Sequence, residues 1–170
     1  MDLGLAGKRA LVTGASGGIG QAVARELAAE GVEVVAIGGA QAIGRYLERF
    51  RDARLSGLCD AGEEPQFRRA FDRAGMAPDF YVCEPDLEAE LIRALGADRV
   101  LEVVEAHGDL APFRTLQKQV EWRGRPVEEQ LRRFMGSGGS RKTRYARYLV
   151  EALEPDQVPR PLDGLLRSIR

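Results

Sequence analysis

Residues 9–40 read RALVTGASGGIGQAVARELAAEGVEVVAIGGA, and this stretch decides the fold. The apolar run Arg9–Thr13 predicts a strand, and Gln21–Glu30 carries apolar residues at helical spacing. Val32–Ile37 predicts a second buried strand. Because both strands are continuously apolar, they are typical of a parallel sheet that is covered on both faces. The stretch therefore predicts a strand–helix–strand unit.

A glycine-rich turn joins the first strand to the helix, with glycines at positions 14, 17, 18 and 20. Glycine lets the backbone come close to an anion, since no Cβ stands in the way. The helix that follows directs free N–H groups and the positive end of its dipole toward the same place. The turn is therefore a predicted site for a nucleotide or another phosphate.

This turn resembles the opening of the short-chain dehydrogenase/reductase family, whose T-G-x-x-x-G-x-G motif is matched by Thr13, Gly14, Gly18 and Gly20. The resemblance covers about residues 3–38 and implies an NAD(P) site. The cofactor-binding residues that it implies are Thr13, Gly14, Ser16, Gly18, Ile19 and Gly20.

Strands and helices continue to alternate after this unit. Arg54–Cys59 and Asp79–Cys83 predict a third and a fourth strand, with helices between and after them, whereas only helices are predicted beyond Ala97. The expected fold is α/β, a Rossmann-like parallel sheet flanked by helices, with a helical C-terminal part. We expect a core domain over residues 1–96 and a helical extension over residues 97–170.

The composition is that of an ordinary globular protein, with 170 residues, a net charge of −1 and 30% charged residues. No apolar run approaches the roughly 18 residues that span a bilayer, and no signal peptide opens the chain, so a cytoplasmic protein without a membrane partner is expected. Cys59 and Cys83 are expected to be buried thiols rather than a disulfide. With His107 as the single histidine, a histidine-based catalytic or metal site is not favoured.

Acidic and basic residues are segregated along the chain. Residues 60–90 contain nine acidic and three basic residues, whereas residues 112–147 contain ten basic and three acidic ones. Carboxylates at the ends of parallel strands can hold a divalent cation, and a basic helical stretch suits a polyanion. Charge alone leaves open a simpler interpretation, in which two oppositely charged surfaces pair with each other or with solvent.

Several separated blocks, among them LSGLCDAGEEPQFRRAF, DLEAELIRALG and RKTRYARYLVEAL, resemble a bacterial family of Toprim domain proteins. That family is related to the C-terminal nuclease domain of OLD-type ATP-dependent endonucleases, and the resemblance covers about residues 30–166. It implies a Toprim-type parallel sheet, Mg²⁺ or Mn²⁺ as cofactor, and nucleic acid or a nucleotide as partner. It leaves open a separate ATPase partner.

The Toprim resemblance implies metal-dependent phosphodiester chemistry of the endonuclease or nucleotidyl transferase/hydrolase type. The catalytic residues that it implies are Asp60, Asp86, Glu88 and Lys142, and the metal ligands are Asp60, Glu64, Asp86 and Glu88. Carboxylates would hold the metal and lysine would neutralise the phosphate. Thr13 stands where the family has a first-strand Glu, so the sequence leaves open whether activity is retained.

The alternative interpretation is an NAD(P)-binding Rossmann protein of the short-chain dehydrogenase/reductase type that lacks that family's Tyr-x-x-x-Lys pair. The residues four positions after the four tyrosines are Phe50, Pro85, Leu149 and Ala152. Gly38 and Gly39 replace the acidic residue that binds the ribose at the end of the second strand. A non-catalytic domain is the third interpretation.

Overall fold

The computed structural model describes residues 4–13, 18–37, 40–50, 52–53, 55–137 and 139–168. These residues form two compact units, which are described separately below. Unit 1 comprises residues 1–82 and 164–170, and unit 2 comprises residues 83–163. The expected domain boundary between residues 96 and 97 falls inside unit 2.

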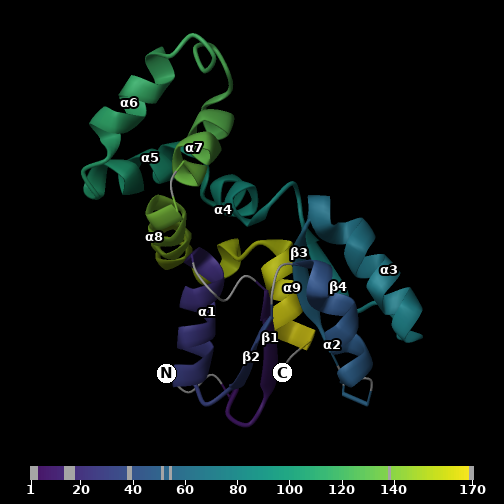
Figure 1. The fold of residues 1–170 in the computed structure, drawn as a ribbon. Helices are drawn as coiled ribbons and strands as arrows, with labels where there is room; N and C mark the ends of the chain where they lie inside the picture. The colour runs from purple at the N-terminus through teal and green to yellow at the C-terminus, as the bar shows by residue number, and fades with distance from the viewer. Residues whose placement is uncertain are drawn as a thin grey trace. The chain divides into compact units, whose positions relative to one another are not determined.

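The β1–α1–β2 segment of unit 1 has the expected strand–helix–strand form. Strand β1 (Arg9–Thr13) pairs in parallel with β2 (Glu33–Ile37), with Arg9 opposite Glu33 and Thr13 opposite Ile37. Helix α1 (Gly18–Ala29) connects the two strands (Figure 1). Gly31 ends the helix region with φ +78°, a backbone conformation that glycine adopts without strain.

A second pair of strands, β3 (Gly57–Asp60) and β4 (Phe80–Cys83), forms its own sheet. The α/β class and the parallel, helix-flanked strand pairing are therefore confirmed. In the described residues, however, the four strands lie in two two-stranded sheets rather than in one sheet. Apolar runs identify strands but not the strands with which they pair, so the sequence could not decide this.

Helices α2 (Ile43–Arg49) and α3 (Glu64–Ala74) complete the apolar core of unit 1. Short 3₁₀ turns at Ala40–Ala42 and Ala61–Glu63 precede them. The partly buried Leu11 of β1 packs against this core. The core also contains Cys59 of β3, so both sheets contribute to it. The buried members of the core are Ile43, Leu47, Cys59, Phe67, Ala70, Phe71 and Ala74.

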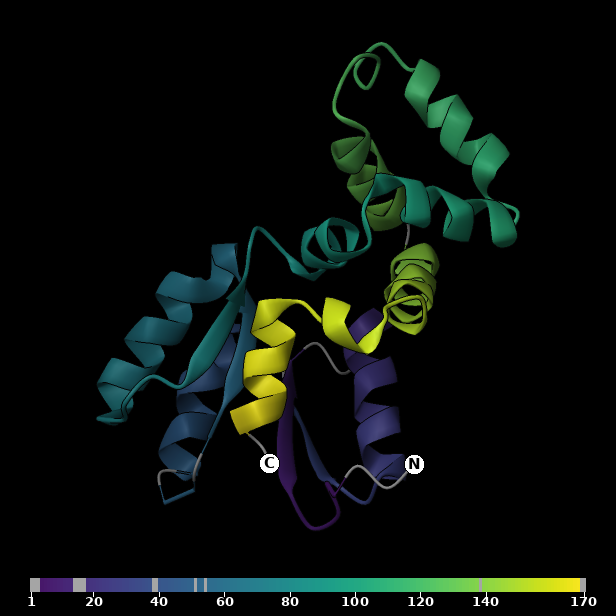
Figure 2. The same cartoon turned by 180° about the vertical axis from the view of Figure 1, so that it is seen from behind.

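The C-terminal helix α9 (Arg160–Ser168), yellow in Figure 2, contributes its last residues to unit 1. The backbone of Gly164 lies directly against the ring of Tyr81, where a Cβ would come within 2.6 Å of Cδ1. The hydroxyl of Ser168 also forms a 2.7 Å hydrogen bond with that of Ser56. The end of the chain is thus held against the N-terminal half of the sequence.

Unit 2 is helical, as predicted for the chain after the fourth strand. Its helices are α4 (Leu87–Leu95), α5 (Ala97–Ala106), α6 (Leu110–Lys118), α7 (Val127–Gly136) and α8 (Gly139–Glu151). A 3₁₀ turn at Pro155–Gln157 follows them. Their apolar faces meet in one core, whose fully buried side chains include Leu91, Val100, Phe113, Leu131, Met135, Tyr145 and Leu149.

The apolar pattern of the sequence predicts a helix over Leu110–Trp122, whereas α6 ends at Lys118. The chain turns at Gln119, whose ψ of 140° is extended. The buried side chain of Gln130 fixes the turn by donating from Nε2 to the carbonyl oxygens of Trp122 at 2.8 Å and Arg125 at 3.1 Å. The buried Gln130 thus anchors the loop between α6 and α7.

The predicted state of the cysteines is confirmed, since Cys59 and Cys83 are both buried and neither forms a disulfide. None of the helices in the described parts of the chain has the length and apolar character that crossing a bilayer requires.

Candidate functional site

The glycine turn predicts a phosphate site at the carboxyl end of the sheet formed by β1 and β2. Because Thr13 is paired with Ile37, β1 and β2 end at the same level. Helix α1 begins only five residues after Thr13, at Gly18. No acidic residue lies in the first turn of this helix, so no carboxylate from that turn opposes the positive end of its dipole.

The predicted cofactor-binding residues are distributed around this junction. Thr13 is the last residue of β1, and Gly18, Ile19 and Gly20 open α1. Gly14 and Ser16 lie outside the described residues. The backbone on both sides of the turn therefore has the predicted form, and the cofactor-binding role of these residues stays a prediction.

The first group of predicted metal ligands belongs to unit 1. Asp60 is the last residue of β3, and Glu64 begins α3, where its carboxylate accepts hydrogen bonds from Arg68 Nε at 2.8 Å and Nη2 at 2.5 Å. Burial raises the pKa of the neighbouring Cys59 thiol to about 11, and the charges of Glu63, Glu64 and Asp60 add to this effect. Burial, with a smaller contribution from these acids, therefore keeps the Cys59 thiol protonated.

Asp86, in unit 2, has a structural role at the start of α4. Its carboxylate accepts hydrogen bonds from the Ala89 backbone N–H at 3.0 Å and from Arg132 Nε at 2.7 Å. Burial by itself would raise the pKa of Asp86. The bonds from Arg132 and Ala89, with the positive charges of Arg132 and Lys142, outweigh burial and lower the pKa below its usual value. Asp86 therefore stays ionised while it caps the helix.

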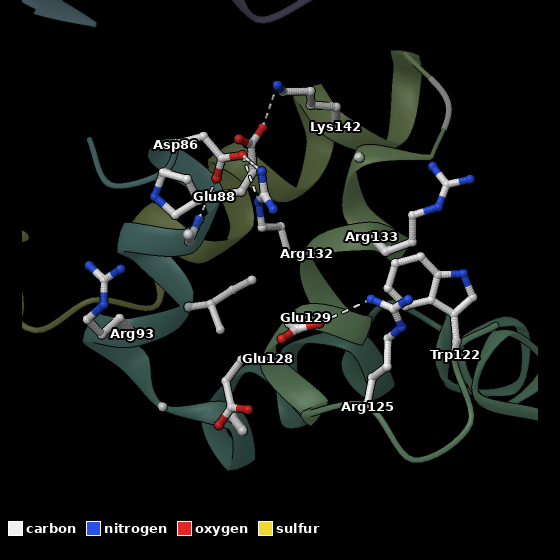
Figure 3. Close-up of a pocket in the computed structure, with 16 residues that line it drawn as sticks. Asp86, Glu88, Arg93, Trp122, Arg125, Glu128, Glu129, Arg132, Arg133 and Lys142 are labelled. Carbon is white, nitrogen blue, oxygen red and sulfur yellow. Dashed lines mark hydrogen bonds and ion pairs between the residues drawn. The ribbon is translucent and has the colours of Figure 1, made fainter. Parts of the chain in front are cut away.

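Glu88 and Lys142 form a second ion pair beside the first (Figure 3). Lys142 Nζ on α8 lies 3.0 Å from Glu88 Oε1, and the Glu88 side chain is only 6% exposed. The structure therefore brings together Asp86, Glu88 and Lys142, whereas Asp60 and Glu64 belong to unit 1.

The described residues contain no group of three or more His, Cys, Asp or Glu side chains that could hold a metal ion. The geometry thus gives no support to the predicted Mg²⁺ or Mn²⁺ site. Three of the four acidic residues singled out from the sequence instead meet basic partners: Arg68 for Glu64, Arg132 for Asp86, and Lys142 for Glu88. These contacts agree with the simpler interpretation of the charge segregation.

Arg132, Arg133 and Trp122, which are not among the predicted site residues, line a pocket of unit 2 together with Asp86 and Glu88. The double arginine in the segment RGRPVEEQLRRF was the available signal. The role of Arg132 depends on Asp86, which lies 46 residues earlier, and sequence spacing does not reveal that contact.

Comparison with known proteins supports the dehydrogenase resemblance. Residues 8–74 match the family model of the short chain dehydrogenases. The L-xylulose reductase of Mesocricetus auratus is 60% identical over 42 residues, which cover 25% of this chain and 17% of that protein. The L-xylulose reductase of Mus musculus is 62% identical over 37 residues, covering 22% and 15% respectively.

The chain thus spans about a sixth of the length of the curated relatives that it matches. No solved structure matches the chain.

These findings overturn the Toprim interpretation. The short chain dehydrogenase match extends to residue 74, through the segments around Glu30–Phe50 and Asp60–Phe71 on which the Toprim resemblance depended, and no match to a Toprim protein supports that resemblance. The predicted nuclease or hydrolase function, with its Mg²⁺ and its DNA binding, is therefore wrong. Short acidic and basic blocks recur in unrelated helical proteins, because such residues commonly occupy helix surfaces.

Proposed function

We propose that residues 8–74 form a dinucleotide-binding segment that binds NAD(P) through the turn between β1 and α1. The observation that carries this proposal is the family match over residues 8–74 on a segment whose strands pair in parallel and end at the same level. In such units the pyrophosphate lies at the N-terminus of the helix, close to the glycine backbone.

The described residues fit a dinucleotide. The side-chain-free positions Gly18 and Gly20 open α1, and no acidic residue occupies its first turn. The pyrophosphate would be held by backbone N–H groups at the N-terminus of α1. When bound, the nicotinamide supplies a hydride donor or acceptor.

The end of β2 favours the phosphorylated coenzyme. The sequence from Ile37 to Ala42 contains no carboxylate to accept a hydrogen bond from the ribose 2′-hydroxyl of NAD. Nor is there a negative charge at this position to repel the 2′-phosphate of NADP. We therefore expect NADPH to bind more tightly than NADH.

The tyrosines of this chain give no support to hydride transfer to a carbonyl substrate. None of the four has a lysine four residues later, which that family uses for proton relay. Tyr145 is 1% exposed and its hydroxyl donates a hydrogen bond to Asp109, while Tyr148 is stacked on His107 with ring centroids 3.5 Å apart. The proposed role of these 170 residues is accordingly coenzyme binding without reduction.

Isothermal titration of the full chain with NADPH and with NADH tests this proposal. Saturable binding of NADPH, tighter than that of NADH, is the expected result. Gly18→Val should abolish it, because a β-branched side chain would block the approach of the pyrophosphate to the backbone. Bound NADPH should also raise the melting temperature through linkage.

Gly62→Ala is the matched control, since a Cβ at Gly62 meets no atom within 4 Å and the residue lies in the same unit. This variant should bind NADPH like the parent chain. Absence of NADPH binding to the folded parent chain would disprove the proposed function.

A further inference from the structure

A pocket of about 780 Å³ lies within unit 2 and is independent of the proposed dinucleotide site. It lies among α4, α7, α8 and the turn that follows α6, and all its lining residues fall between Pro85 and Lys142 (Figure 3). Its size is in the range of small-molecule sites. It also lies outside residues 8–74, so the family match says nothing about it.

Two arginines stand over the single tryptophan at one end of this pocket. The guanidinium carbons of Arg125 and Arg133 lie 5.0 Å and 5.9 Å from the centre of the Trp122 ring. Cation–π attraction to the indole holds both guanidinium groups in place. Two cationic side chains therefore flank the same indole at this end of the pocket.

These two arginines are only weakly neutralised. Arg125 reaches Glu129 at 3.6 Å, with both side chains about half exposed, which makes a weak pair. Among the residues that the structure describes, Arg133 meets no carboxylate within 4.0 Å. The Trp122 end of the pocket therefore retains positive charge.

The remaining carboxylates do not compensate for this charge. Asp86 is paired with Arg132 and Glu88 with Lys142, at the side of the pocket away from Trp122 (Figure 3). Glu128 likewise points away from Arg133 in this view. The charged walls thus divide into a paired side and a cationic side.

The cationic side is built on a fixed backbone. The buried Gln130 holds the carbonyl oxygens of Trp122 and Arg125, and Arg125 Nε donates to the Glu121 carbonyl oxygen at 2.8 Å. Gln117 donates from Nε2 to Gln130 Oε1 at 2.6 Å, so the amide of Gln130 is itself oriented. A site positioned in this way loses little conformational entropy when a ligand binds.

We propose that this pocket binds a small organic phosphate, with the phosphate monoester at Arg125 and Arg133 and its organic part on the apolar lining of the pocket. Two guanidinium forks match the charge and the several acceptor oxygens of a phosphate dianion. The apolar lining lets an attached hydrocarbon or ring add to the affinity.

Trp122 makes the test direct, because it is the only tryptophan in the chain. Its fluorescence is followed during titration with phenyl phosphate, inorganic phosphate, benzoate and phenol at constant ionic strength. The expected result is a saturable change with phenyl phosphate, a weaker one with inorganic phosphate, and none with phenol. Benzoate binding as tight as that of phenyl phosphate would overturn the assignment of a phosphate head group.

Variants of Arg133 complete the test. Arg133→Gln should weaken phenyl phosphate binding by about tenfold, because it removes one charge-assisted contact, and Arg133→Lys should weaken it less. The matched control is Arg147→Gln, an exposed arginine of the same unit that pairs with Glu151 and does not line this pocket.

Circular dichroism confirms that each variant is folded before titration. Unchanged phenyl phosphate affinity in folded Arg133→Gln, or a fluorescence change that never saturates in the parent chain, would overturn the proposal.

Discussion

The Tyr145 hydroxyl on α8 donates a 3.0 Å hydrogen bond to Oδ2 of Asp109, which lies 36 residues earlier at the start of α6. Tyr145 is 1% exposed, so its polar atom needs this partner. Burial, the hydrogen bond and the charge of Asp109 together raise the pKa of Tyr145 well above its usual value. The contact therefore stabilises unit 2 only while the phenol is protonated.

Tyr145→Phe should lower the free energy of unfolding of unit 2 by about 1 kcal/mol at pH 7, the usual net contribution of one such bond. Urea unfolding followed by Trp122 fluorescence measures this, since Trp122 belongs to the same unit.

The difference between the parent chain and Tyr145→Phe should shrink above pH 10. The raised pKa means that the folded state keeps the Tyr145 proton while the unfolded state loses it, so only the parent loses this contribution as the pH rises. A difference that stays constant from pH 8 to pH 11 would contradict the assignment.

Asp86→Ala should cost unit 2 about 2 kcal/mol at pH 7, because it removes both the cap of α4 and the partner of Arg132. Since the folded pKa of Asp86 is lowered, its contribution is present above the unfolded pKa and is lost as the pH falls through the folded value. The cost measured by urea unfolding should therefore decrease toward pH 2.

Glu151→Gln is the control for this variant, because Glu151 forms an exposed pair with Arg147. It should change stability by less than about 0.5 kcal/mol. An equal effect of the two substitutions would show that Asp86 acts only as a surface charge.

Gly164→Ala should destabilise unit 1 by about 2 kcal/mol, because the added Cβ would overlap the ring of Tyr81. Thermal unfolding followed by circular dichroism measures the effect. Gly44→Ala, with only an ordinary 3.9 Å contact to Ala70, should be tolerated. Tyr81→Ala removes the ring that the new Cβ would meet. Adding Gly164→Ala to Tyr81→Ala should therefore cost less stability than Gly164→Ala costs in the parent chain.

Cys59 should react slowly with a disulfide reagent at pH 8 in the folded chain. Its pKa is raised to about 11, first by burial, so almost no thiolate is present, and the side chain is buried. Both thiols should react rapidly in urea. In Cys83→Ser only Cys59 can react, so this variant gives the reaction rate of Cys59 alone. Fast reaction of Cys59 in the folded variant would contradict the burial and raised pKa of this thiol.

Local patterns in the sequence determined much of the secondary structure. The apolar run of β1 and the helical spacing of α1 follow from interactions within a few residues. The glycine turn also carried a valid signal, since its resemblance to the dehydrogenases agrees with the family match over residues 8–74. Such features are readable because each depends on neighbours along the chain.

Only the tertiary structure decided what the charged residues do. The acidic blocks suggested a metal site, but Asp86 meets Arg132 and Glu88 meets Lys142, partners that lie 46 and 54 positions further along the chain. The pairing of strands into two sheets and the gathering of Arg125 and Arg133 around Trp122 were equally beyond sequence spacing. A charge changes its role with the partner that folding brings to it, and that partner is set by the packing of distant helices.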